Sequence, residues 1–167
     1  MSLNITEADR INQTTVARSI LNASIKHSGR LMRFVNTYGD THRIDFRMDR
    51  GEQATWKPLY FFEVKCRLKK YDPFKISREK IEEGFAIAQR AKLPFWLWVW
   101  FSTEGFARGV LIDDLNLPSS GVYHGSRPGN GEASFDFRLN RFTHEVPIQG
   151  TYQCSPNSNE KVRQPAE

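Results

Sequence analysis

Two acidic residues and a lysine are spaced so that they could do chemistry together: Asp45, Glu63 and Lys65. Residues 59–67, which hold Glu63 and Lys65, are rich in aromatic and β-branched side chains and are predicted to form a strand. Side chains two apart in a strand share a face, and Asp45 joins them if its own predicted strand pairs with this one. Two carboxylates suit a hard divalent cation, and an ammonium suits a developing anion or the activation of a water.

The surrounding segments predict the elements that would position these residues. Helices are predicted at residues 6–28 and 77–91, and strands at 31–37, 42–49, 59–67, 94–101 and 105–113. The strand at 94–101 is apolar throughout, so we expect it to be buried. Two further strands, at 133–139 and 141–148, predict a C-terminal β-hairpin after a Gly- and Pro-rich segment.

This arrangement resembles the PD-(D/E)xK, or restriction-endonuclease-like, nuclease superfamily over roughly residues 30–102. The residues that carry the likeness are Ile44-Asp45, with isoleucine where the family name has proline, and Glu63-Val64-Lys65. The resemblance implies an α/β fold, in which helices flank a central mixed β-sheet in the order αβββαβ. It further implies a DNA endonuclease that uses Mg²⁺, or Mn²⁺ as a substitute, held by the Asp45 and Glu63 carboxylates and the Val64 carbonyl. Lys65 would orient the attacking water or stabilise the transition state.

The resemblance also draws attention to Glu7 and Gln89. A first-helix glutamate often adds a metal ligand in this family, and Glu7 would have that role; an acidic residue in a first helical turn also simply complements the helix dipole. Some members carry a glutamine or lysine in the second helix that contacts water or the scissile phosphate. Gln89 would be that residue, or an ordinary exposed helix residue. Asp40 is the alternative to Asp45 as a ligand, but beside Gly39 it is typical of a turn.

The net charge of +5 favours a polyanionic partner. A basic group that follows the Glu63 strand is predicted to contact DNA phosphates: Lys69, Lys70, Lys75, Arg78 and Lys80. The chain shows no separate recognition domain, so we expect it to read DNA structure, or sequence only weakly, in recombination or repair. Family resolvases are dimers, and a homodimer is therefore expected by analogy.

The chain of 167 residues fits one domain, predicted over residues 1–149, followed by a polar tail over 150–167 that is predicted to be disordered. No apolar run reaches the length of a membrane helix and the first residues lack the pattern of a secretory signal, so we expect a cytoplasmic protein with no membrane partner. Two alternatives stay open. One is a non-catalytic nucleic-acid-binding or assembly module that retains the nuclease fold; the other is an unrelated α+β domain in which Glu63 and Lys65 form a surface pair.

Overall fold

The computed structural model describes residues 3–37, 44–114, 117–118, 120–124 and 131–154. Two helices, a short 3-10 helix and nine strands are found in this part of the chain. They are α1 (Leu3–Ser28), β1 (Met32–Asn36), β2 (Phe46–Glu52), β3 (Thr55–Arg67), β4 (Phe74–Ser77), α2 (Arg78–Ala91), β5 (Phe95–Phe101), β6 (Phe106–Ile112), β7 (Ser120–His124), β8 (Gly131–Phe137), η1 (Leu139–Arg141) and β9 (His144–Pro147). None of these helices is long and apolar enough to cross a membrane.

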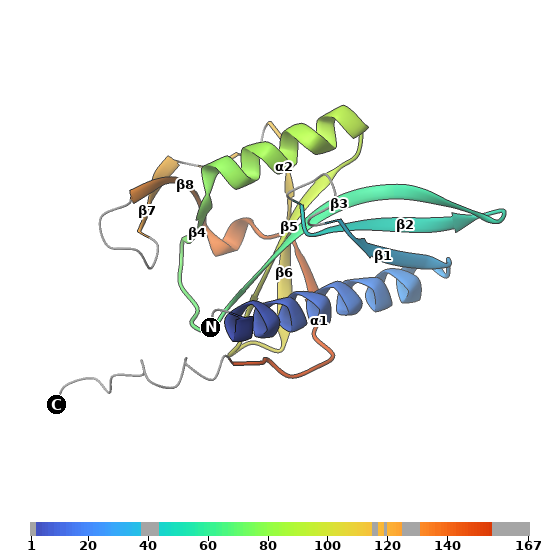
Figure 1. Ribbon diagram of the computed structural model, residues 1–167, viewed down its shortest axis with the longest axis horizontal. Coiled ribbons are helices and arrows are strands. Elements are labelled where there is room, and N and C mark those ends of the chain that lie inside the picture. The colour runs from blue at the N-terminus through green and yellow to red at the C-terminus, as the bar shows by residue number, and fades with distance from the viewer. Residues whose placement is uncertain (1–2, 38–43, 115–116, 119, 125–130, 155–167) are drawn as a thin grey trace.

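The main sheet has six strands in the order β1-β2-β3-β5-β6-β9. β3 and β5 are parallel, and the other neighbours are antiparallel, so the sheet is mixed. The helix α2 forms the crossover between the two parallel strands, as a parallel connection requires (Figure 1). The predicted α/β fold and the αβββαβ order of its core are therefore confirmed; β4 adds a short strand just before α2.

The central strand β5 is buried on both faces, as its sequence predicts. Trp98 and Trp100 lie in the hydrophobic layer that α1 covers. Leu97 and Val99 lie in the layer that α2 covers. The side chains of one strand thus serve two cores, and the two helices lie on opposite faces of the sheet (Figure 1).

The predicted pairing of the C-terminal hairpin is wrong. β8 pairs with β7 and β4 in a second, three-stranded sheet, whereas β9 pairs with the edge of the main sheet at β6. Between β8 and β9 the chain forms the 3-10 helix η1, where Leu139 is buried and its N–H donates to Asp72 Oδ1 at 3.1 Å. That contact ties the end of β8 to the loop after β3.

The β2–β3 hairpin is longer than predicted, and it projects past α2 together with β1 (Figure 1). The predicted strands end at residue 49 and begin again at residue 59, but β2 continues through Glu52, β3 begins at Thr55, and Gln53 and Ala54 form the turn. Both turn residues have positive φ, at 41° and 67°. Such turns usually carry Asn-Gly, so Gln-Ala gives no signal in the sequence. The projecting part, residues 30–36 and 46–58, is called the arm below.

Part of the segment predicted as a tail packs on the domain. The Asn12 side chain exchanges two hydrogen bonds of 2.8 Å with the backbone of Gln153. The Tyr152 ring lies 5.0 Å from the Trp100 ring. Residues 155–167 lie outside the described residues.

Candidate active site

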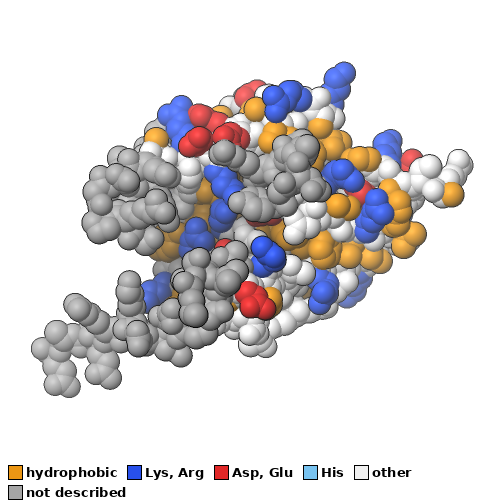
Figure 2. Space-filling model, in the orientation of Figure 1, with side chains coloured by type: hydrophobic (Ala, Val, Ile, Leu, Met, Phe, Trp, Pro, Cys, Tyr) orange, Lys and Arg blue, Asp and Glu red, His pale blue; other side chains and the backbone are white. Residues whose placement is uncertain are grey.

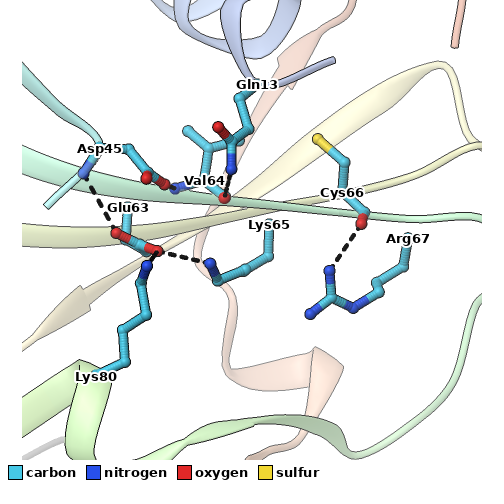
Figure 3. Close-up of polar contacts among 8 residues, drawn as sticks. All are labelled: Gln13, Asp45, Glu63, Val64, Lys65, Cys66, Arg67 and Lys80. Carbon is cyan, nitrogen blue, oxygen red and sulfur yellow. Dashed lines mark hydrogen bonds and ion pairs between the residues drawn. The ribbon is translucent and has the colours of Figure 1, made fainter. Parts of the chain in front are cut away.

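Strand register places the two predicted carboxylates next to each other. Phe46 is opposite Phe62 in the antiparallel β2–β3 ladder, so the next positions outward are Asp45 and Glu63. The Asp45 N–H donates to Glu63 Oε2 at 3.3 Å, and the Val64 N–H donates to Asp45 Oδ2 at 3.0 Å (Figure 3). Both acids are buried, with exposed fractions of 5% and 1%.

Two lysines from different elements meet Glu63. Lys65 Nζ lies 2.7 Å from Glu63 Oε1, and Lys80 Nζ lies 3.0 Å from the same oxygen (Figure 3). Lys65 comes from the same strand, whereas Lys80 comes from the first turn of α2. The helix can approach so closely because Gly84, one turn later, has no side chain: a Cβ there would lie 2.6 Å from the ring of Phe95. The glycine thus positions the lysine.

The environment shifts the pKa of Asp45 upward. Burial raises this pKa most and the neighbouring Glu63 carboxylate raises it further, while Lys65, the hydrogen bond from Val64 and Lys80 lower it; the result is about 7. Burial by itself lowers the pKa of Lys80, but the carboxylates of Glu63 and Asp45 outweigh it and raise that pKa above its usual range. Asp45 therefore exchanges its proton near neutral pH, while Lys80 stays charged.

A pocket of about 200 Å³ opens beside these residues, and α1 supplies one of its walls. Its lining residues are Asp9, Arg10, Gln13, Asn36, Asp45, Phe46, Lys65 and Lys80. Gln13 reaches from α1 to the sheet, where its Nε2 donates to the Val64 carbonyl at 3.3 Å (Figure 3). The site therefore lies between the two helices, where β2 begins beside β3.

The oxygen atoms at this point fit a hard divalent cation. The Asp45 and Glu63 carboxylates and the Val64 carbonyl are all hard donors of the kind that Mg²⁺ prefers. The mutual repulsion that helps raise the Asp45 pKa would be relieved by a cation between the two acids. Within the described residues no third acidic, histidine or cysteine side chain completes such a cluster.

Two other predicted site residues lie away from this pocket. Glu7 is exposed on α1 and lines a separate surface hollow with Arg10, Ile11 and their neighbours. Gln89 is exposed near the end of α2, more than two turns after Lys80. Asp40, the alternative ligand, lies outside the described residues.

The basic residues predicted to contact DNA follow β3 on a loop, a strand and a helix. Their ion-pair partners are Glu104 for Lys70 at 2.7 Å, Asp136 for Lys75 at 2.8 Å, Glu82 for Arg78 at 2.7 Å and Glu63 for Lys80 at 3.0 Å. Lys69 is exposed on the loop. Lys80 thus differs from the others because it points into the candidate site.

Sequence reasoning missed that Lys80 and Gln13 belong to the site. The only available signals were weak. Lys80 stands in the first turn of the helix that follows the Glu63 strand, and Gln13 follows Asp9 at the spacing of one helical turn. Both assignments depend on how the helices dock on the sheet.

No family model matches this chain, and no curated protein matches it. Two solved structures show a distant likeness. One is Hjc, a Holliday junction resolvase from the archaeal hyperthermophile Archaeoglobus fulgidus, with 12% identity and a TM-score of 0.47 over 82% of this chain and 92% of that chain. The other is D212, a nuclease from a fusselovirus, with 10% identity and a TM-score of 0.42 over 78% of this chain and 83% of that chain. At such identities and TM-scores, these structures do not assign a function to this chain.

Proposed function

We propose that this protein is a metal-dependent endonuclease of the PD-(D/E)xK superfamily that hydrolyses phosphodiester bonds in DNA. One observation carries the proposal: the buried carboxylates of Asp45 and Glu63 lie side by side, and Lys65 lies 2.7 Å from Glu63 at the edge of an open pocket. The proposed metal is Mg²⁺, with Mn²⁺ as a substitute. Its ligands would be Asp45, Glu63 and the Val64 carbonyl.

A divalent cation held there would neutralise the phosphate and lower the pKa of a bound water. The protein's own groups prepare this chemistry. Asp45 must be ionised to act as a ligand, and because its pKa is about 7, uptake of a cation would release a proton at neutral pH. Lys65 would place its ammonium against the charge that develops on the phosphoryl oxygens. Glu7 and Gln89 have no part in the proposed set because they lie away from the pocket.

We further propose that the substrate is recognised by its structure or only weakly by its sequence. Lys69 and Lys70, on the loop after β3, would contact its phosphates. The protein would act as a homodimer. Because phosphate contacts position DNA without reading bases, affinity for different sequences is expected to be similar.

Cleavage assays with purified variants test the proposal. The wild type is expected to cut linear, branched or single-stranded DNA with Mg²⁺ and not with EDTA. Asp45→Asn and Lys65→Ala should each lose at least about a hundredfold in rate, the scale for one transition-state electrostatic group, while still binding DNA. Asp114→Asn, which removes an exposed carboxylate, is the matched control and should cut normally. Undiminished cleavage by an Asp45→Asn, Lys65→Ala double variant would refute the assigned site.

A specific observation also favours the non-catalytic alternative. The ammonium groups of Lys65 and Lys80 already balance the two carboxylates when both are ionised, so the cluster needs no cation for neutrality. A nucleic-acid-binding module with such a cluster would bind DNA but neither cut it nor take up Mg²⁺ or Mn²⁺. Calorimetric titration with each metal separates the two functions.

A further inference from the structure

One face of the arm is left uncovered by the helices. On the opposite face, Met32, Phe46 and Met48 pack in the layer that α1 covers. Arg33 is paired with Asp49 across β1 and β2, so its side chain points away from that layer, to the side on which Glu63 also projects. The arm extends past α2, and Figure 2 shows basic and hydrophobic side chains gathered over it. Among the described residues, this face follows the same strands to the candidate active site.

A buried carboxylate fixes two guanidinium groups on this face. Asp49 is 0% exposed; its Oδ2 accepts from Arg33 Nε at 3.1 Å, and its Oδ1 accepts from Arg47 Nε at 2.6 Å. The Arg33 side chain is still 44% exposed and that of Arg47 is 30% exposed. One carboxylate between two guanidinium groups leaves an excess positive charge. Arginine forks held in place in this way match the oxygens of a phosphate.

An exposed aromatic ring adjoins these arginines. The Arg33 guanidinium lies 4.3 Å from the centre of the Trp56 ring, and Trp56 is 37% exposed. Leu31, which is 67% exposed, lies next to it over Gly51, where a Cβ would lie only 3.2 Å from the leucine Cδ2. Contacts to phosphates alone need no tryptophan, whereas an unpaired base outside a nucleic-acid duplex can stack on a tryptophan ring. The surface therefore offers a partner for each part of a single nucleic-acid strand: arginines for its phosphates and an aromatic ring for the faces of its bases.

We propose that the arm is a binding site for an unpaired stretch of nucleic acid, with phosphates on Arg33 and Arg47 and a base stacked at Trp56. Glu63 follows Trp56 by seven positions in β3, which corresponds to about 24 Å along the strand. A nucleic-acid strand that leaves the candidate active site can therefore run along the arm to its tip. That this polymer is DNA rests on the proposed function, and the site would explain a preference for branched or tailed DNA over blunt duplex.

The test measures binding in EDTA, where no cleavage occurs, to a blunt duplex and to the same duplex with a single-stranded overhang. Trp56→Ala is expected to lose about five- to hundredfold in affinity for the tailed DNA, the effect of one stacked base, and little for the blunt duplex. Trp56→Phe should keep most of the affinity. Lys57→Ala is the matched control, because Lys57 is the next residue, is exposed and points to the other face. Lys57→Ala should lower the affinity for both DNAs slightly and equally.

Fluorescence supplies a second readout. Tryptophan emission of the wild type should be quenched by the tailed DNA, and this quenching should be lost in Trp56→Phe. An unchanged affinity of Trp56→Ala for the tailed DNA would overturn the proposal, as would an equal loss for both substrates. If Trp56→Ala changed the molecular mass measured by light scattering, the proposal would also be overturned, because this face of the arm would then join two copies of the chain. If the wild type cuts DNA while Trp56→Ala binds normally, only the arm site fails; if the wild type neither binds nor cuts DNA, the proposed function fails with it.

Discussion

Replacing Asp45 with asparagine is expected to stabilise the metal-free protein, although it removes a proposed metal ligand. Asparagine keeps an oxygen that can accept the hydrogen bond from Val64, but it cannot ionise beside Glu63. The wild type, in contrast, must place a second negative charge in a buried position when Asp45 loses its proton. The prediction is therefore a gain in stability that depends on pH.

The size of the gain follows from the pKa of Asp45, which rises from 3.8 to about 7 on folding. Below pH 3.8 the folded and unfolded chains both hold the proton. Between pH 3.8 and about 7 the unfolded chain loses it first, so the wild type loses stability as the pH rises, and above about 7 the loss levels off. At about 1.4 kcal/mol per pKa unit, the full loss is about 4 kcal/mol, and at pH 5 it is about 1.7 kcal/mol.

The assay is equilibrium unfolding by urea or heat in EDTA, for the wild type and Asp45→Asn, at pH 5 and pH 8. For a protein of this size, about 4 kcal/mol corresponds to a rise in Tm of about 8–16 °C at pH 8. Asp49→Asn, four residues further along the chain in β2, is the matched control. Burial alone would raise the pKa of Asp49, but its hydrogen bonds from Arg47 and Arg33 lower it. Its loss should therefore destabilise the protein at pH 8 and do so less as the pH falls through the acid range.

Two results would refute this reasoning. One is an Asp45→Asn protein that is less stable than the wild type at pH 8 without metal. The other is a gain in stability of the same size at pH 5 and pH 8, which would show that ionisation of Asp45 is not its cause.

Three further predictions concern the surroundings of the site. Lys80→Met should raise the affinity for Mg²⁺ about tenfold or more in calorimetric titration, because an ammonium 3.0 Å from Glu63 repels a cation; an unchanged affinity would mean that the ammonium moves aside without cost. Lys69→Ala should weaken DNA binding equally for all sequences and lower the slope of affinity against salt by about 1, whereas a loss for one sequence only would indicate base reading. Gly84→Ala should destabilise the protein by about 1–3 kcal/mol in urea unfolding, because its Cβ would lie 2.6 Å from Phe95; equal stability would show that the ring can give way.

The part of the site that follows strand alternation could be predicted from the sequence. Glu63 and Lys65 share a face because their separation is two residues, and Asp45 joins them because β2 and β3 pair in the expected order. The burial of β5 on both faces was equally readable, since its apolar residues do not alternate with polar ones. These features are local, or they depend on one pairing of neighbouring strands.

The rest depends on contacts that no spacing encodes. Lys80 reaches Glu63 only because Gly84 lets α2 lie against Phe95, and that approach is a property of the packed layers. The predicted pairing of residues 141–148 with residues 133–139 is wrong because η1, with Leu139 buried, lies between β8 and β9, and β9 pairs with β6. Turns made by residues without a strong preference, and the docking of helices, are settled by tertiary packing.

The hydrogen bonds between Asn12 and Gln153 join positions 141 residues apart. Gln149 adds to this clasp, since its N–H donates to Ser19 on the same helix at 3.1 Å. During synthesis, α1 emerges from the ribosome well before residues 149–153, which fasten it to the sheet. Because contacts at such long sequence separation form slowly, the wall that carries Gln13 should be completed late. A nascent chain would then hold Asp45, Glu63, Lys65 and Lys80 well before it has a finished pocket, which would delay any activity until synthesis has passed residue 153.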